Sequence, residues 1–283
     1  VGALLIGLTA AKSISWVLDI PIIAINHLHA HLYAINLTHK NVQYPLIGLL
    51  ASGGHTSLFL IKNETDYTYL GGTLDDAAGE AFDKVAKILG LGYPGGPKID
   101  KIAKEGNRDA IPFPRSYLAK DSLDFSFSGI KTSVLYHFQG TNRLTNPERE
   151  THDAKGSLCH KEIADIAASF QESVVEVLVK KSLNAFKKYS QLPEAVLNST
   201  MDSLRPVLYV PPVGIAVGGG VARNSRLREK FKEVSAEMNI PVLYPLPVLC
   251  TDNAAMIAGL AYHKFKENDF ADLSLEALPD YHS

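Results

Sequence analysis

The 283-residue chain has two cysteines, Cys159 and Cys250, and a nearly balanced net charge of -2 at pH 7. Two cysteines cannot form the multi-disulfide framework of small secreted domains, so reducing surroundings are expected. The pI near 6.6 argues against a generally basic surface that coats nucleic acid. No apolar run reaches the roughly 20 residues of a membrane-spanning helix, so no membrane contact is expected.

The start of the sequence lacks two further features. Residues 1–10 are apolar, but no basic segment precedes them as it would in a secretory signal peptide. The first residue is Val1 rather than methionine, so we expect the chain to begin inside a longer gene product. With 46% hydrophobic and 20% charged residues, the composition is that of a globular protein with one large or two modest domains.

Three common catalytic or nucleotide-binding motifs are also missing. No His-Glu-x-x-His occurs, so a metalloprotease would lack its general base. The triple glycine at 218–220 is not followed by Gly-Lys-Ser/Thr, which excludes a P-loop, and its spacing differs from that of the Rossmann fingerprint. A metalloprotease, a P-loop and a Rossmann dinucleotide site are therefore disfavoured.

Hydrophobic periodicity and turn residues predict a mixed α/β chain. Apolar runs predict strands at 21–25, 46–51, 56–62, 67–71, 213–217 and 241–244. Helical patterns are expected at 3–18, 27–37, 75–92, 98–105, 160–189, 225–239 and 251–265. Residues 113–132 read as irregular, and the polar stretches 141–156 and 191–208 read as exposed loops or insertions. Antiparallel strands followed by helices favour an α/β or α+β lobe.

The segment 26–31 (NHLHAH) carries the first candidate for chemistry. His27 and His31 are four residues apart, which on a helix places both imidazoles on one face. Two neutral imidazoles at that spacing can share a divalent metal such as zinc or iron. The alternative is a helix with ordinary surface histidines. Asp252, where another helix is expected to begin with Thr251 as its cap, could add an oxygen ligand or serve only in capping.

Two glycine turns follow expected strands, at 52–55 (SGGH) and 218–220 (GGG). Glycines allow the backbone to approach an anion closely, and a following helix offers free N–H groups to a phosphate. Each turn alone could equally be an ordinary loop. Two carboxylates, Asp83 and Asp100, flank the loop 93–97 and could bind ribose hydroxyls, or could simply be solvated helix charges. The two turns together favour a nucleotide held between two lobes.

Seven segments together resemble the TsaD family, whose members are tRNA N6-adenosine threonylcarbamoyltransferases. They are HxxxH at 27–31, LASGGHT at 50–56, DDAAGEAFDK at 75–84, YPGGP at 93–97, FSFSGIKT at 125–132, GGGVARN at 218–224 and TDNAAMI at 251–257. The resemblance runs in order from Val1 to about Ala261. It implies an actin-like, two-lobed α/β fold of the type shared with sugar kinases.

The resemblance also implies how the chain is divided. Residues 1–45, joined by the C-terminal helix in 252–283, are expected to form what remains of the first lobe, and 46–251 the second lobe with a helical insertion. Family members usually begin with earlier strands that this sequence lacks, so the first lobe is expected to be incomplete at its N-terminus.

The activity implied is transfer of a threonylcarbamoyl group from L-threonylcarbamoyladenylate to N6 of adenosine 37 in tRNAs that read ANN codons. The metal, iron(II) or alternatively zinc, would be held by the positions matching His27, His31 and Asp252. Asp83 is the candidate proton acceptor. The expected substrate-binding positions are Leu50, Ala51, Ser52, Gly53, Gly54, Asp83, Gly96, Asp100 and Asn224.

The resemblance further implies partners. Bacterial members act with a paralogous actin-like protein of the TsaB type and an ATPase of the TsaE type, and the hairpin at 52–56 resembles the bacterial and organellar branches. A cytoplasmic location is therefore expected, or a mitochondrial one for an organellar member. The alternative that remains is a non-catalytic, nucleotide-binding scaffold subunit of the same complex. An incomplete first lobe would favour that scaffold, whereas the intact His27, His31 and Asp252 disfavour it.

Overall fold

The computed structural model describes residues 2–119, 121–145, 159–191 and 209–277. Its centre is a five-stranded sheet in the order β3-β2-β1-β4-β5. The strands are β1 (Leu46–Ala51), β2 (Thr56–Ile61), β3 (Tyr67–Gly72), β4 (Gly214–Gly218) and β5 (Val242–Leu243). β1 pairs antiparallel with β2 and parallel with β4, so the carboxyl ends of β1 and β4 lie at the same edge.

Alternating side chains of β1 and β2 enter two separate cores, as the period of a strand requires. On one face, Ile47, Leu49 and Leu58 pack into the large core beneath the helices α3 to α7. On the other face, Leu46, Leu50 and Phe59 pack against the short helix α2. Both faces of the sheet are therefore covered, which explains why β1 is a continuous apolar run.

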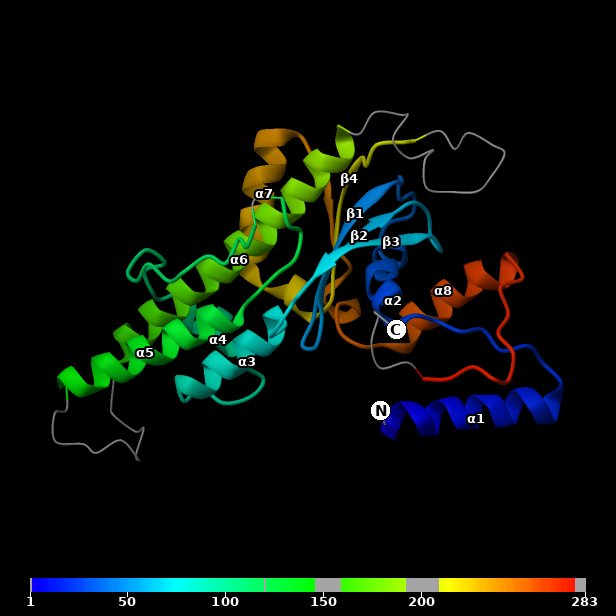
Figure 1. Ribbon diagram of the computed structural model, residues 1–283, viewed down its shortest axis with the longest axis horizontal. Helices are drawn as coiled ribbons and strands as arrows, with labels where there is room; N and C mark the ends of the chain where they lie inside the picture. The colour runs from blue at the N-terminus through cyan, green and yellow to red at the C-terminus, as the bar shows by residue number, and fades with distance from the viewer. Residues whose placement is uncertain (1, 120, 146–158, 192–208, 278–283) are drawn as a thin grey trace.

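The helices divide between these two faces (Figure 1). The large core is covered by α3 (Ala78–Ile88), α4 (Gly95–Ala103), α5 (Ser128–Thr145), α6 (His160–Ser190) and α7 (Ser225–Met238). The opposite side carries α2 (His27–Tyr33), the 3-10 turn η1 (Ala34–Leu37) and α8 (Ala254–Lys266). Two further 3-10 turns are η3 (Gly220–Arg223) and η4 (Pro247–Leu249). Helix α1 (Gly2–Leu18) lies apart from the sheet.

Several expected elements differ from the observed ones. Of the strand expected at 21–25, only Ile22 pairs, in an isolated bridge to Ala271 outside the five-stranded sheet. The helix expected over 75–92 is shorter, since α3 begins at Ala78. Asp75 instead accepts hydrogen bonds from Ser126 and from the amide of Phe127, which anchors the start of α5.

Three boundaries also differ. α4 already begins at Gly95, within the turn expected to interrupt the helices. α5 (128–145) covers the end of the stretch 113–132 expected to be irregular and the start of the loop expected at 141–156. The cap of α8 is Asn253 rather than Thr251, because its Oδ1 accepts from the amide of Met256 at 2.9 Å. The rest of the loop expected at 141–156 and nearly all of the insertion at 191–208 lie outside the described residues. The proposed division into 1–45 with 252–283 and 46–251 remains a prediction.

Within the described ranges, no helix is both long enough and apolar enough to cross a membrane.

Candidate active site

Helix α2 presents the two histidines of the HxxxH motif. Asn26 caps it, because its Oδ1 accepts hydrogen bonds from the amides of Leu28 at 2.8 Å and His29 at 3.2 Å. The rings of His27 and His31 lie edge to face with centroids 4.6 Å apart. A Cβ added at Gly218 would lie 2.6 Å from the carbonyl oxygen of His31, so a glycine at the end of β4 allows α2 to lie this close to the sheet.

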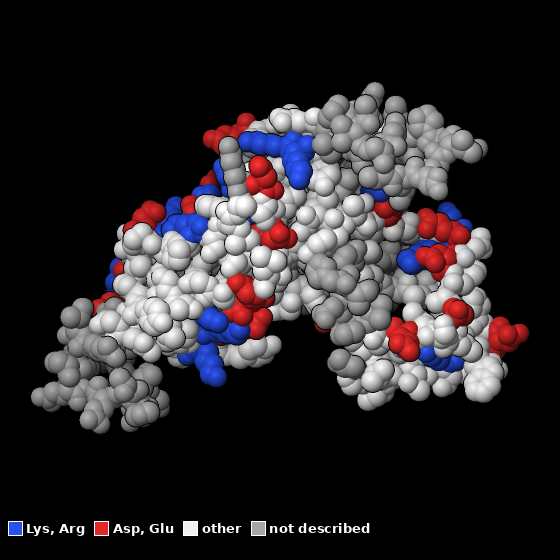
Figure 2. Space-filling view, viewed as in Figure 1, with Lys and Arg blue, Asp and Glu red and all other residues white. Residues whose placement is uncertain are grey.

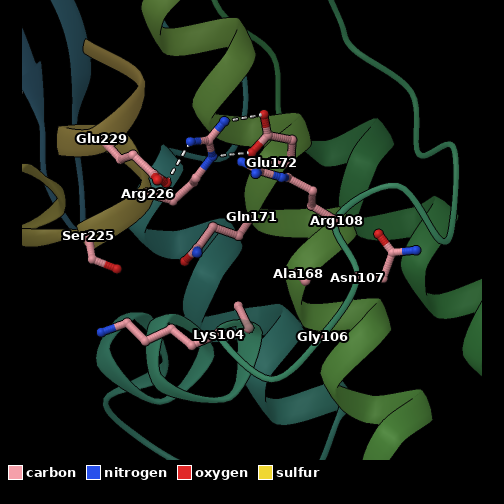
Figure 3. Close-up of a pocket in the computed structure, with 11 residues that line it drawn as sticks. Lys104, Gly106, Asn107, Arg108, Ala168, Gln171, Glu172, Ser225, Arg226 and Glu229 are labelled. Atoms are coloured by element: carbon pink, nitrogen blue, oxygen red, sulfur yellow. Dashed lines mark hydrogen bonds and ion pairs between the residues drawn. The ribbon is translucent and has the colours of Figure 1, made fainter. Parts of the chain in front are cut away.

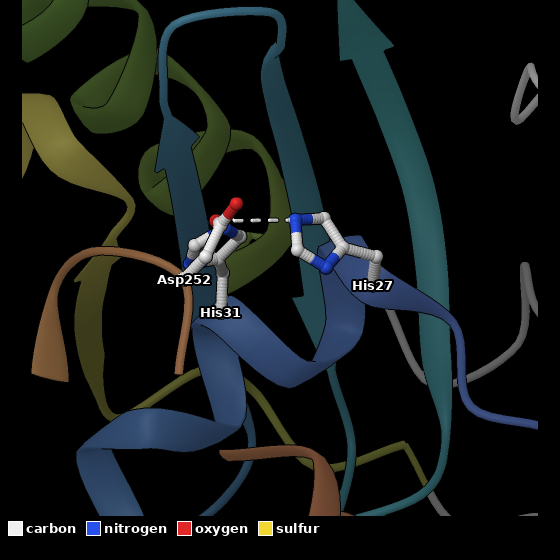
Figure 4. A group of neighbouring side chains, drawn as sticks. All are labelled: His27, His31 and Asp252. Atoms are coloured by element: carbon white, nitrogen blue, oxygen red, sulfur yellow. Dashed lines mark ion pairs between the residues drawn. The ribbon is translucent and has the colours of Figure 1, made fainter. Parts of the chain in front are cut away.

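Asp252 completes a cluster with these histidines, although it precedes α8 near the other end of the sequence (Figure 4). Its Oδ1 lies 3.0 Å from Nε2 of His31 and 3.4 Å from Nε2 of His27. One potential ligand atom from each residue falls within 4.8 Å of the others. The side chain of His31 is 3% exposed, whereas those of His27 and Asp252 are 49% and 80% exposed, so one side of the cluster is open to solvent.

The protonation chemistry of this cluster suits a cation. Burial and the neighbouring His27 hold the pKa of His31 below its usual value, although Asp252 opposes them. His31 is therefore neutral near pH 7, as a metal ligand must be. Its Nδ1 is buried without a hydrogen-bond partner among the described residues, whereas Nε2 faces Oδ1 of Asp252, so Nε2 is the atom placed to bind a metal. Two imidazoles and one carboxylate leave coordination positions open, as a catalytic metal requires.

The two predicted glycine turns lie together at the carboxyl ends of β1 and β4. Gly219 has a φ of 86°, and a Cβ there would collide with the carbonyl oxygen of Ala51. Gly79, at the start of α3, donates its amide to the carbonyl of Ser52 at 3.1 Å, and a Cβ on it would lie 2.5 Å from that oxygen. Ligands of open α/β sheets bind outside the carboxyl ends of parallel strands, which is where these turns are placed.

The residues of the first turn differ in what they can contact. Leu50 and Ala51 are fully buried in β1, so only their backbone could reach a ligand. Ser52 closes the turn, because its amide donates to the carbonyl of His55 at 2.8 Å. Gly53 and Gly54 are exposed, with nothing within 4 Å of an added Cβ. Their side of the turn is therefore the part that an anion could approach.

The predicted carboxylates each hold the start of a helix. Asp83 Oδ1 accepts from the amide of Gly95 at 2.7 Å, at the beginning of α4. Asp100 Oδ1 accepts from the amide of Ser225 at 3.1 Å and from its hydroxyl at 2.8 Å, at the beginning of α7. One oxygen of each carboxylate is thus used within the protein. Gly96 stands in open space, since nothing lies within 4 Å of an added Cβ.

Asn224 is also engaged within the protein. Its Oδ1 caps α7 by accepting from the amide of Leu227 at 2.9 Å, and its Nδ2 donates to Oε1 of Gln171 at 2.7 Å. Gln171 and Ser225 were not predicted from the sequence. Ser225 directly follows the predicted Asn224, so its position in the sequence could have indicated it. Nothing in the sequence indicates that Gln171 of α6 contacts Asn224.

A pocket of about 270 Å³ opens beside Asn224 and Ser225, between α4, α6 and α7 (Figure 3). Arg226 and Glu172 form an ion pair in its wall, with N···O distances of 2.5 and 3.0 Å. Burial opposes ionisation of Glu172, but hydrogen bonds from Arg226 and Lys230 outweigh it and lower the pKa to about 2. The pair fixes α7 on α6 and so positions the start of α7, where Asn224 and Ser225 lie.

Known proteins resemble this chain over nearly its whole length. The family model of tRNA N6-adenosine threonylcarbamoyltransferase, TsaD, matches residues 1–259. The protein of that name from Clostridioides difficile (strain 630) is 45% identical over 280 residues, which cover 99% of this chain and 73% of the relative. Its counterpart from Moorella thermoacetica is 44% identical over 280 residues, covering 99% and 72%.

Among solved structures, full-length HypF in its phosphate- and nucleotide-bound form superposes with a TM-score of 0.62. The match has 13% identity and covers 89% of this chain and 45% of HypF, so it concerns the fold alone. The expected actin-like α/β fold is confirmed. The resemblance drawn from the seven motifs is confirmed as well, and the chain belongs to the TsaD family of tRNA N6-adenosine threonylcarbamoyltransferases.

Proposed function

We propose that the protein transfers the threonylcarbamoyl group of L-threonylcarbamoyladenylate to N6 of adenosine 37 in tRNAs that read ANN codons. Membership of the family makes it a transferase in t6A synthesis. The donor, the tRNA position and the need for a metal are part of the proposal. The observation that carries it is the convergence of His27, His31 and Asp252, whose ligand atoms lie within 4.8 Å.

The metal in this proposal is iron(II), with zinc as the alternative, held by Nε2 of His27, Nε2 of His31 and a carboxylate oxygen of Asp252. When bound, such an ion supplies Lewis acidity to oxygens of the donor. The protein's own part is to place the ligands. α2 is fixed against the sheet at Gly218, and Asp252 is held just before the Asn253 cap of α8.

The remaining predicted residues bind the donor in this proposal. Backbone N–H groups of Gly53 and Gly54 hold the phosphate, because their side of the turn is open. Asp100 and Asn224 face the nucleoside, with one carboxylate oxygen of Asp100 left for a ribose hydroxyl. Leu50, Ala51 and Ser52 contribute backbone and turn geometry, and Gly96 leaves room for the ligand.

The reaction is an acyl transfer to an amine. The N6 nitrogen attacks the carbamoyl carbon, the bond from that carbon to the phosphate oxygen breaks, and AMP leaves. The amine loses one proton, for which Asp83 is the proposed acceptor. The donor is already an activated mixed anhydride, so holding the two reactants in contact supplies much of the rate.

The partners in this proposal are a TsaB-type actin-like paralogue and a TsaE-type ATPase, in the cytoplasm. The net charge of -2 supports dependence on partners, because RNA affinity requires positive charge that the chain as a whole lacks.

The test is transfer of labelled threonine to an ANN-decoding tRNA by the purified full-length protein, with the synthase that makes the donor and the candidate partners. His27→Ala/His31→Ala should abolish incorporation, while His160→Ala, an exposed histidine at the start of α6, should not. A wild-type protein that binds donor and partners without incorporating label would indicate the scaffold instead. Equal incorporation by wild type and the double variant would remove the metal from the mechanism.

A further inference from the structure

A second pocket lies beside the carboxyl-terminal half of α6, lined by residues that the reaction does not use. It encloses about 610 Å³ and is lined by Tyr117, Asp121, Leu123, Lys180, Lys181, Asn184, Lys187 and Lys188. Four of these eight residues are lysines, in a chain whose net charge is -2. Basic side chains gather where this end of α6 lies on the face shown in Figure 2.

The lysines fall on one stretch of helix surface. Lys180, Asn184 and Lys187 follow one another at intervals of four and three residues, the spacing of neighbours along one helix face. Lys180 and Lys187 are therefore about 10 Å apart along the helix axis. Lys180, Lys187 and Lys188 are exposed, and none forms an ion pair in the part of the chain that the structure describes.

Lys181 has a different role in the same pocket. It is 1% exposed, and its Nζ donates to the carbonyls of Tyr117 at 2.7 Å and Ser122 at 2.5 Å. It therefore fixes the loop that forms the opposite wall. That loop presents Tyr117, which is 41% exposed, beside the three exposed lysines. Asp121 is the one acidic residue among the described residues of the lining, which therefore carry net positive charge.

Exposed cations on a fixed surface next to an accessible aromatic ring are the features of a nucleic-acid contact. A phosphate backbone neutralises several lysines at once, and an unstacked base can lie against a tyrosine ring. We propose that Lys180, Lys187 and Lys188 bind the phosphate backbone of the tRNA substrate. This inference rests on the proposed function, and it assigns the tRNA backbone to a part of α6 outside the metal cluster and the glycine turns.

The test is a triple variant, Lys180→Ala/Lys187→Ala/Lys188→Ala, in the full-length protein assembled with its partners. The matched control is Lys40→Ala/Lys87→Ala/Lys232→Ala. These three lysines are exposed elsewhere on the protein, and their substitution removes the same amount of positive charge. The experiment measures tRNA affinity as a function of salt and the kinetics of transfer. A third variant with arginine at 180, 187 and 188 retains the charge and should restore binding.

We expect the α6 triple variant to weaken tRNA binding roughly tenfold or more at low salt. The slope of log affinity against log salt should fall by about 1 for each phosphate that is no longer neutralised. KM for tRNA should rise while kcat and the KM for the donor stay near wild type. Binding and kinetics equal to the control variant would overturn the proposal. So would a failure of partner assembly with tRNA affinity unchanged, since the face would then bind an acidic protein. An inactive wild-type protein would instead refute the proposed function.

Discussion

Nε2 of His31 lies 3.0 Å from Oδ1 of Asp252, which joins a buried helix face to an exposed residue near the other end of the chain. His27 reaches the same oxygen at 3.4 Å. Side chains this close together are held either by hydrogen bonds among themselves or by a cation that all three bind. The two cases differ in what removal of Asp252 should do, because only a cation requires all three residues together.

Substitution of Asp252 by asparagine should therefore lower metal occupancy. Loss of a supporting group around a metal ligand commonly costs 10- to 100-fold in affinity, so loss of a ligand should cost at least about 100-fold. Metal content after dialysis, measured by elemental analysis, checks this expectation. Asp269→Asn is the matched control, since this carboxylate just beyond α8 pairs with Lys264 instead. Equal metal content in both variants would argue against a metal site here.

A second prediction concerns the close approach of the glycine turns. Gly219→Ala should destabilise the protein by about 1–3 kcal/mol, because a side chain is strained at a φ of 86° and would also collide with the carbonyl of Ala51. Gly220→Ala is the control, since nothing lies within 4 Å of its added Cβ. Urea unfolding of the two variants should separate them clearly. Equal stabilities would show that Gly219 does not lie so close to the carbonyl of Ala51.

A third prediction uses two adjacent glycines at the start of α4. Gly96→Ala adds a methyl group to open space, whereas the same change at Gly95 places it 2.6 Å from Cα of Asp83. Gly96→Ala should therefore fold at least as stably as wild type, since alanine favours helix by up to about 1 kcal/mol. If Gly96 lines the donor site, KM for the donor should nevertheless rise. Unchanged kinetics in a stable Gly96→Ala protein would remove Gly96 from the site, while Gly95→Ala should lose stability.

Elements could be predicted from the sequence where the pattern that marks them lies within a few consecutive residues. The apolar run of β1 and the four-residue spacing of His27 and His31 identify their elements without knowledge of the rest of the chain. Contacts between distant segments were not predictable in this way. Asp75 read as a helix N-terminus but accepts from the segment before α5, and the buried Lys181 would be placed on the surface by its type alone.

The same limit applies to the candidate site. Asn224 was identified by its motif, yet Gln171 and the capping bond to Leu227 decide how its amide is oriented. The capping bond is local to the start of α7, but the bond to Gln171 depends on how α6 packs against α7, which requires the whole core to be assembled. Short patterns thus indicate which residues to consider, and tertiary packing determines which of their atoms remain available to a ligand.

A last prediction follows from the ion pair that fixes α7 on α6. The pKa of Glu172 is lowered to about 2, from the ordinary value of 4.5. A carboxyl whose pKa is depressed by folding stabilises the protein above its unfolded pKa and loses that contribution as the pH falls. Stability should therefore decline between pH 4.5 and about 2, by about 3 kcal/mol from this group. Glu172→Gln should reduce that decline, as measured by urea unfolding across the pH range.

Glu233→Gln provides the matched control, because Glu233 pairs with the same Arg226 but its side chain is 52% exposed. An exposed pair contributes up to about 1 kcal/mol, so this variant should keep the acid dependence of the wild type. Glu172→Gln should also be less stable at neutral pH, since it leaves Arg226 buried without its closest carboxylate. If both variants lose stability equally with acid, the pair with Glu172 is not the group that fixes α7, and the position of Asn224 must depend on other contacts.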